Sequence, residues 1–173
     1  MKRALVVAAC AVALGGVATQ SGSSSPGATV RVRLAGPPAT IVEYGYVRSL
    51  ARKGSSYRMR FDPALWLSGE TANRAAEADG VIAPGEGVPN DYYVRNESRK
   101  QLTYTVPHSA RVTVVTHSDG AGVRSTRIPV SELAAIVKGR NPKGRNLYAG
   151  NTFGYWVRVA GDRAVALDQQ YQP

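Results

Sequence analysis

Residues 40–61 read TIVEYGYVRSLARKGSSYRMRF, and no other stretch of the chain indicates a β fold so clearly. Apolar and polar side chains alternate on both sides of residues 52–55, which contain Gly54 and form a turn. Alternation is typical of a half-buried strand, and two such runs around a short turn predict a β-hairpin. Gly45 interrupts the first run, and we expect a bulge or bend there.

The rest of the chain carries similar short patterns. Two short helices are expected at residues 70–79 and 131–138, each with a serine cap at its start and a glycine after its end. Asp62 directly before Pro63 predicts an additional helical turn, because this pair is typical of a helix start. Further strands are expected at residues 30–34, 91–96, 101–106, 110–116, 123–130, 155–159 and 164–167.

Short strands with two short helices between them favour a mainly β (α+β) fold. We expect a small twisted β-barrel similar to the oligonucleotide/oligosaccharide-binding (OB) fold, with an open α+β sheet as the alternative. Residues 29–173 should form this single domain, because about 145 residues are enough to bury one core without disulfides.

The first eighteen residues have the layout of a secretory signal peptide. Two cations precede an apolar run at residues 4–16, which is shorter than the about 20 apolar residues of a transmembrane helix. The small residues up to Ala18 offer a cleavage site, so we expect the mature protein to begin at Thr19 and to be secreted. Residues 19–28 (TQSGSSSPGA) are expected to be a disordered tether rich in Gly, Ser and Pro.

Cys10 is the single cysteine of the chain and lies inside the expected signal. Cleavage after Ala18 would leave a mature protein without a thiol, a disulfide or a cysteine metal ligand. The alternative is a lipoprotein, because Val7-Ala8-Ala9-Cys10 fits a loose lipidation site. Soluble export is favoured, since processing at Cys10 would leave an apolar segment of about six residues, below the usual length of about 7 to 15.

The chain is basic, with 22 Lys and Arg against 12 Asp and Glu and a net charge of +10. A basic exported protein is attracted to anionic envelope polymers, phospholipid headgroups and nucleic acid. Most of the cations alternate with apolar residues, which favours a solvated sheet face. The alternative, a polyanion-binding patch, rests on the basic loop that carries Arg140, Lys143 and Arg145.

Patterns that indicate catalysis are weak. His108 and His117 are nine residues apart, which matches no zinc spacing, and we expect neither a metal site nor a cofactor. Asp91 is the carboxylate with the least structural explanation, whereas Asp62 is explained as a helix cap. A hydrolase that uses Asp91 with a second carboxylate is therefore an alternative, although we assign no catalytic residue.

Tyrosines and an arginine around residues 90–95 form the main candidate binding surface. Aromatic rings and a nearby cation are the combination that single-stranded nucleic acid and sugars both use. At least half of the aromatic side chains are expected to pack in the core. The candidate binding residues are Asn90, Asp91, Tyr92, Tyr93, Arg95 and Tyr104, and Tyr44, Tyr46, Tyr57 and Trp156 could extend the surface.

Several segments resemble a group of small uncharacterised exported proteins of actinobacteria and bacilli. They are FDPALWLSGE at residues 61–70, AAEADG at 75–80, VPNDYYVRN at 88–96 and the ending with YWV at 155–157 and QYQP at 170–173. The resemblance covers roughly residue 44 to the C-terminus. It implies export and a single domain, and it implies no activity, substrate or catalytic residue.

Together these patterns predict an exported, non-catalytic interaction module of the cell envelope or extracellular space. The partner would be an anionic envelope polymer or another exported protein, and the membrane would be reached only through the possible lipid anchor. A secreted carboxylate-dependent hydrolase and a binder of polyanions or nucleic acid are the alternatives.

Overall fold

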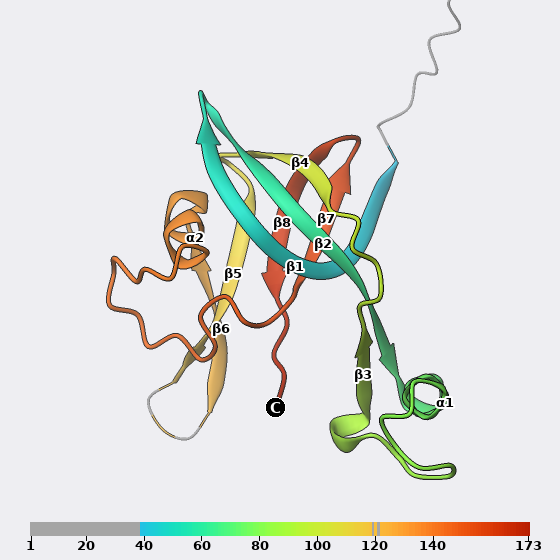
Figure 1. Ribbon diagram of the computed structural model, residues 1–173. Coiled ribbons are helices and arrows are strands. Elements are labelled where there is room, and N and C mark those ends of the chain that lie inside the picture. Colours follow the sequence, from blue (N-terminus) through green and yellow to red (C-terminus); the bar gives the residue numbers. More distant parts are fainter. Residues whose placement is uncertain (1–38, 119, 121) are drawn as a thin grey trace, which may run out of the picture. The chain divides into compact units, whose positions relative to one another are not determined.

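The computed structural model describes residues 39–118, 120 and 122–173. The expected signal peptide, the tether and the strand at residues 30–34 lie outside these residues. The described part contains eight strands and two α-helices (Figure 1). In chain order they are β1 (Thr40–Lys53), β2 (Ser56–Ser68), α1 (Gly69–Ala78), the 3-10 turn η1 (Pro89–Asp91), β3 (Tyr92–Arg95), β4 (Leu102–Pro107), β5 (Arg111–His117), β6 (Val123–Ile128), α2 (Val130–Ile136), β7 (Tyr155–Ala160) and β8 (Arg163–Gln169).

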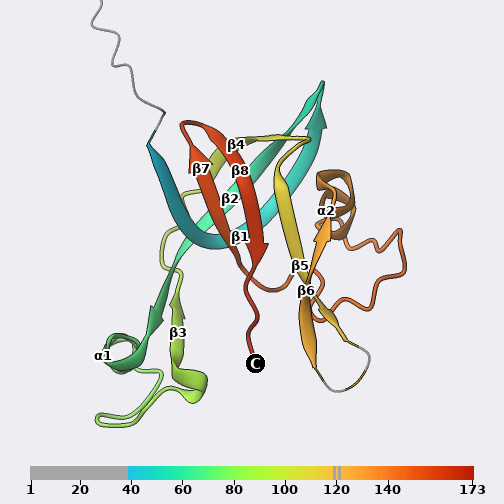
Figure 2. The same ribbon diagram turned by 180° about the vertical axis from the view of Figure 1, so that it is seen from behind.

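Five of the strands close into a barrel. β1 pairs with β2, β2 with β4, β8 with β7 and β7 with β1, all antiparallel, and a parallel contact between β4 and β8 completes the ring. α2 precedes β7 in the chain and lies to one side of the strands in both views (Figures 1 and 2). The expected OB-like barrel is confirmed. The alternative of an open sheet is wrong, because the contact of β4 with both β2 and β8 closes the ring.

The core fills the barrel and continues under α2. Tyr57, Met59 and Phe61 of β2 all point inward, as the alternation of this strand predicts, and each is at most 5% exposed. Leu133 and Ile136 of α2 belong to the same buried cluster. The two expected helices are both present, with bounds close to the predicted ones. Neither helix of the described residues has the length and apolar character needed to cross a membrane.

The helical turn expected after Asp62 is wrong, because β2 continues without a break to Ser68. Its second half pairs with β3, with Trp66 opposite Val94. The ring of Trp66 also stacks on Tyr92 of β3, with 4.4 Å between ring centroids and 8° between planes. Cross-strand pairing of this kind stabilises a strand and outweighs the local preference of an Asp-Pro pair for a helix start.

The irregularity of β1 lies at Arg48 and not at Gly45. The pairing with β2 runs evenly through Gly45 and shifts between Val47 and Ser49, so Arg48 is the extra residue of a β-bulge. Bulges re-aim side chains, and this one leaves Arg48 on the outer surface of the sheet. Gly45 has a different role, since a Cβ there would collide with the backbone of Asp62 and Pro63.

Candidate functional site

A row of cationic side chains crosses the outer side of the barrel. Arg58 of β2 lies opposite Thr105 of β4, which in turn lies opposite Arg163 of β8, and residues opposite one another share a face. Two residues further along β2, Arg60 lies opposite Thr103 of β4. The alternation that points Tyr57, Met59 and Phe61 inward thereby points the arginines outward. We call Arg58, Arg60, Thr103, Thr105 and Arg163 the β2–β4 face.

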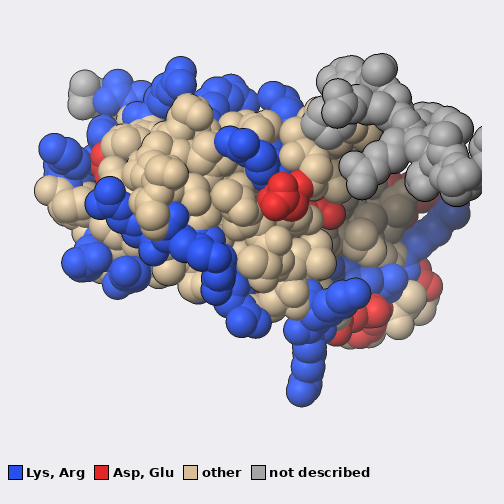
Figure 3. All heavy atoms as spheres, turned by 90° about the horizontal axis from the view of Figure 1, so that it is seen from above, with Lys and Arg blue, Asp and Glu red and all other residues tan. Residues whose placement is uncertain are grey.

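The cations of this face are not neutralised by carboxylates of the described residues. Arg58, Arg60 and Arg163 are exposed and form no ion pair within that part of the chain. The same holds for Arg52 and Lys53 in the adjoining β1–β2 turn. Seen from the barrel end that carries the β1–β2 and β7–β8 turns, Lys and Arg form most of the charged surface (Figure 3). The face is therefore suited to an anionic ligand.

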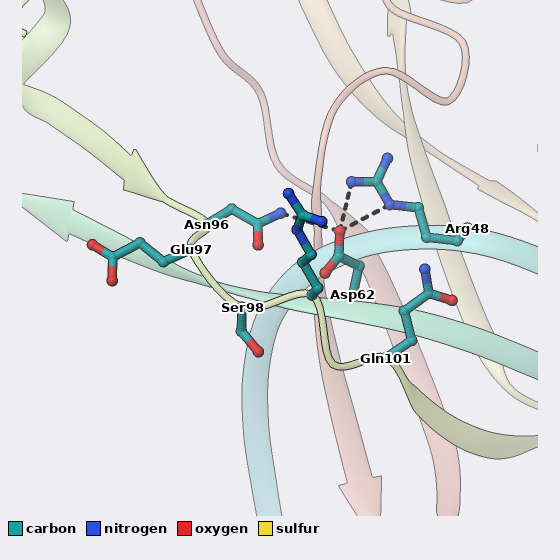
Figure 4. A pocket seen from close by; sticks show the side chains of 7 residues that line it. Arg48, Asp62, Asn96, Glu97, Ser98 and Gln101 are labelled. Atoms are coloured by element: carbon teal, nitrogen blue, oxygen red, sulfur yellow. Dashed lines mark hydrogen bonds and ion pairs between the residues drawn. The ribbon is translucent and has the colours of Figure 1, made fainter.

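Three hollows open along this outer surface. The first, about 240 Å³ in volume, is lined by Ala51, Arg52, Lys53 and Arg58. The second, about 420 Å³, is lined by Ser55, Ser56, Thr105, Pro107, Asp162 and Arg163. The third, about 510 Å³, is lined by Arg48, Asp62, Asn96, Glu97, Ser98, Arg99 and Gln101, and we call it the Asp62 hollow (Figure 4).

Asp62 forms the floor of its hollow, with a side chain that is only 9% exposed. Its Oδ2 atom accepts three hydrogen bonds, from Arg48 Nε at 2.9 Å, Arg48 Nη2 at 2.5 Å and Asn96 Nδ2 at 3.1 Å. The described residues donate no hydrogen bond to Oδ1. The hollow therefore contains a fixed carboxylate with one oxygen available to a ligand.

Three parts of the chain build the Asp62 hollow. The bulge in β1 supplies Arg48, the middle of β2 supplies Asp62, and the segment between β3 and β4 supplies Asn96 and Gln101. Gln101 also accepts a hydrogen bond from Arg60 Nε at 2.9 Å, which links the hollow to the β2–β4 face. The guanidinium of Arg48 lies 5.2 Å above the ring centroid of Tyr46.

The residues predicted to form one aromatic binding surface are divided among separate environments. Tyr92 stacks on Trp66. The Tyr93 side chain reaches the end of α1, where its hydroxyl donates a hydrogen bond to Asp79 Oδ2 at 3.0 Å. Tyr104 lies on another strand and donates to Glu43 Oε2 at 2.5 Å. Arg95 binds both oxygens of Asp79, at 2.8 Å and 2.6 Å, at the end of α1.

Asn90 and Asp91 form the turn before β3. Both have left-handed backbone conformations, with φ values of 59° and 57°, which Asn and Asp tolerate better than most residues. Asn90 donates a hydrogen bond to the carbonyl oxygen of Pro173 at 3.3 Å, so the turn contacts the end of the chain. Asp91 is exposed and lines none of the three hollows.

Three of the aromatic residues expected to extend the surface, Tyr44, Tyr46 and Trp156, form one cluster with Trp66, on which Tyr92 stacks. Tyr44 contacts Trp156 and Trp66, at 5.1 Å between ring centroids in both cases. The C-terminal segment covers part of this cluster, because Gln172 Nε2 donates to the Tyr44 hydroxyl at 2.8 Å. Burial is the main cause that raises the pKa of Tyr44. Tyr57 is separate and belongs to the barrel core.

The expected polyanion patch contains two exposed cations and a third that forms an ion pair within the protein. Arg140 and Lys143 lie exposed on the loop after α2. Arg145 forms an ion pair with Glu132 of α2, whose side chain is 3% exposed, and its Nη2 lies 3.2 Å from Glu132 Oε2. Arg145 therefore neutralises a buried charge and holds the loop against α2.

Sequence reasoning missed Asp62 and Arg48 as site residues. The Asp-Pro pair indicates a helix start at Asp62, and the alternation of β2 places Arg58 and Arg60 only among the cations of a solvated sheet face. The spacing Arg58-x-Arg60-x-Asp62 was a usable signal, because alternate residues of a strand point to the same side.

No protein-family model matches the chain, and no curated protein or solved structure is significantly similar to it. The resemblance to small exported proteins therefore stays a prediction. Within residues 39–118, 120 and 122–173, no three His, Cys, Asp or Glu side chains are grouped as metal ligands would be.

Proposed function

We propose that this protein is an exported, non-catalytic binding module of the cell envelope or extracellular space, and that its ligand is an anionic polymer lying along the β2–β4 face. The observation that carries the proposal is the row of exposed cations without carboxylate partners in the described residues. The signal-like start of the sequence supports export.

The spacing of the cations favours an extended ligand over a compact ion. Arg58 and Arg60 are two residues apart on one strand, which separates their Cα atoms by about 7 Å. Arg163 of β8 is separated from Arg58 of β2 by the intervening strand β4. Two spacings between neighbouring strands amount to about 10 Å. Charges distributed over such a line match the repeating charges of a polymer, since no single small anion reaches all of them.

The composition of the face argues against single-stranded nucleic acid. Proteins that bind single strands without sequence preference stack the bases on aromatic side chains. None of the residues that line the three hollows is aromatic. The polymer is therefore expected to carry its charges on units without nucleobases, as acidic polymers of the cell envelope do.

The test compares two variants with the same change in charge. Arg58→Glu with Arg60→Glu reverses two cations of the β2–β4 face, and Arg140→Glu with Lys143→Glu reverses two exposed cations of the loop after α2. Binding to poly-L-glutamate is measured by isothermal titration calorimetry in a series of salt concentrations. The first variant should bind at least about tenfold more weakly and show a shallower salt dependence, because ion pairs with the polymer release counterions.

The loop variant should retain nearly all of the affinity. This control also tests the patch expected from the sequence, since it removes Arg140 and Lys143. Equal affinity of the two variants, or a larger loss in the loop variant, would show that the β2–β4 face is not the binding site.

A further inference from the structure

We infer that the Asp62 hollow binds the hydroxyl groups of a polymer unit, and that the polymer on the β2–β4 face is an acidic polysaccharide. This inference rests on the proposed function and names the class of its ligand. It is argued from the ion pairs of the hollow, the hydrogen bonds of Asp62 and the link between Gln101 and Arg60.

The lining of the hollow is polar and contains one cation without a partner. It consists of two arginines, two carboxylates and three uncharged polar side chains, which are Arg48, Arg99, Asp62, Glu97, Asn96, Ser98 and Gln101. Asp62 is paired with Arg48 and Glu97 with Arg95, so Arg99 is paired with no carboxylate of the described residues. An acidic sugar unit can therefore place its hydroxyl groups at Asp62 and its carboxylate at Arg99.

Asp62 supplies the acceptor for such a unit. The carboxylate is held in place through Oδ2 by Arg48 and Asn96, while Oδ1 receives no hydrogen bond from the described residues (Figure 4). Oδ1 is open to solvent, so a ligand hydroxyl can donate to it in place of water. Because the donors on Oδ2 already fix the carboxylate, binding requires little further ordering of the side chain.

Gln101 supplies a donor next to this acceptor and connects the two parts of the site. Its Oε1 accepts from Arg60 Nε, so its Nε2 amino group remains to donate to a ligand oxygen. A hydroxyl group both donates and accepts, which is what this pair of groups requires. A unit bound in the hollow would also lie beside Arg60, which would bind the charged group of the next unit of the polymer.

The experiment compares two polymers with one carboxylate per unit. Polygalacturonate carries hydroxyl groups on every unit, and poly-L-glutamate carries none. The wild-type protein should bind polygalacturonate about five- to tenfold more tightly at equal carboxylate number and chain length, as expected for one or two additional hydrogen bonds. Gln101→Ala should weaken the binding of polygalacturonate more than the binding of poly-L-glutamate and so remove most of this preference.

Ser125→Ala is the control, since Ser125 is exposed on β6 and lines none of the three hollows. Asp62→Asn, with its fold verified by circular dichroism, should abolish the preference more completely than Gln101→Ala. Equal binding of both polymers by the wild type, or a Gln101→Ala effect of the same size on both, would overturn the inference. Failure of the proposed function is recognised separately, because Arg58→Glu with Arg60→Glu would then weaken neither polymer.

Discussion

At the scale of single residues, Gly45 explains how β1 and β2 come close enough to form the Asp62 hollow. A Cβ atom at this position would lie 2.8 Å from Phe61 Cζ and 2.9 Å from Pro63 Cα, and it would overlap the carbonyl oxygen of Asp62. The close approach places Asp62 where Arg48 can reach it. Glycine is required at position 45 because a side chain would not fit there, and not because the backbone is left-handed.

We therefore expect Gly45→Ala to destabilise the protein by about 2 kcal/mol or more, because the added methyl group overpacks the interface of β1 with β2. Gly87→Ala is the control, since a Cβ there would meet only Asn73 Oδ1, at 4.0 Å. Its free energy of unfolding should change by less than about 0.5 kcal/mol. Urea denaturation of both variants measures the difference, and equal stabilities would contradict this role of Gly45.

Asp79 is a residue whose contribution should depend on pH. Its hydrogen bonds from Arg95 lower the pKa of its carboxyl group in the folded protein. A lowered pKa means that the contribution to stability is fully present above the pKa of the unfolded chain, which is about 3.9. The contribution is lost as the pH falls below that value and through the folded pKa.

Asp79→Asn should consequently reduce stability near neutral pH and make it less sensitive to acid. The free energy of unfolding of the variant and the wild type should converge as the pH is lowered below about 4. Thermal unfolding followed at several pH values provides the measurement. A difference that stays constant down to the lowest pH would exclude the ionised carboxylate as the cause.

At the scale of elements, the ion pair of Glu132 with Arg145 attaches the loop after α2 to its helix. Glu132 is nearly fully buried, and within the described residues its charge is balanced by Arg145. A buried carboxylate that loses its partner retains the cost of desolvation, which makes removal of one partner more harmful than removal of both. The loop after α2 is therefore held by Arg145, a cation that the sequence analysis placed in a ligand-binding patch.

We expect Arg145→Met to destabilise the protein by about 3 kcal/mol, and Glu132→Leu combined with Arg145→Met to recover most of the loss. Arg140→Met is the matched control, because Arg140 is exposed in the same loop, and it should leave stability nearly unchanged. Differential scanning calorimetry of the three variants measures these effects. Similar melting temperatures for the Arg145 and Arg140 variants would refute the structural role of Arg145.

At the scale of the whole molecule, closure of the barrel places the cations of β2 and β8 on one surface. Residues 58 and 163 are far apart in the chain, and the parallel contact of β4 with β8 brings them to the same face. The proposed export belongs to this scale as well, because the proposed ligand, an acidic polymer of the envelope, is accessible only to a protein outside the cytosol.

The mature protein recovered from culture medium should begin at Thr19 and contain no cysteine, since Cys10 lies within the expected signal. Intact-mass spectrometry of the secreted protein measures this directly. A mass that includes a lipid on Cys10 would establish the lipoprotein alternative. Recovery of the protein with Met1 attached only from the cell interior would contradict export.

Much of the secondary structure followed from local patterns. The hairpin of β1 with β2, most other strands and both helices were predicted, because hydrophobic periodicity relates residues that are neighbours in the chain. The expected serine caps are wrong, since Ser68 makes no capping hydrogen bond and Ser131 lies inside α2, which follows Pro129. The same local reasoning failed at Asp62, where pairing of β2 with β3 overrode the preference of an Asp-Pro pair. It also misplaced the bulge of β1, since a bulge depends on the register with the partner strand.

The sequence alone determined that this is a basic, β-rich chain with a signal-like start, and it favoured an OB-like barrel over an open sheet. The tertiary structure alone decided which charges are available, because pairing depends on residues distant in sequence: Arg145 was found beside Glu132, and Arg95 beside Asp79. It also created the Asp62 hollow from three separate segments of the chain. Side-chain proximity across strands follows from register and closure, and no local pattern of residues encodes either one.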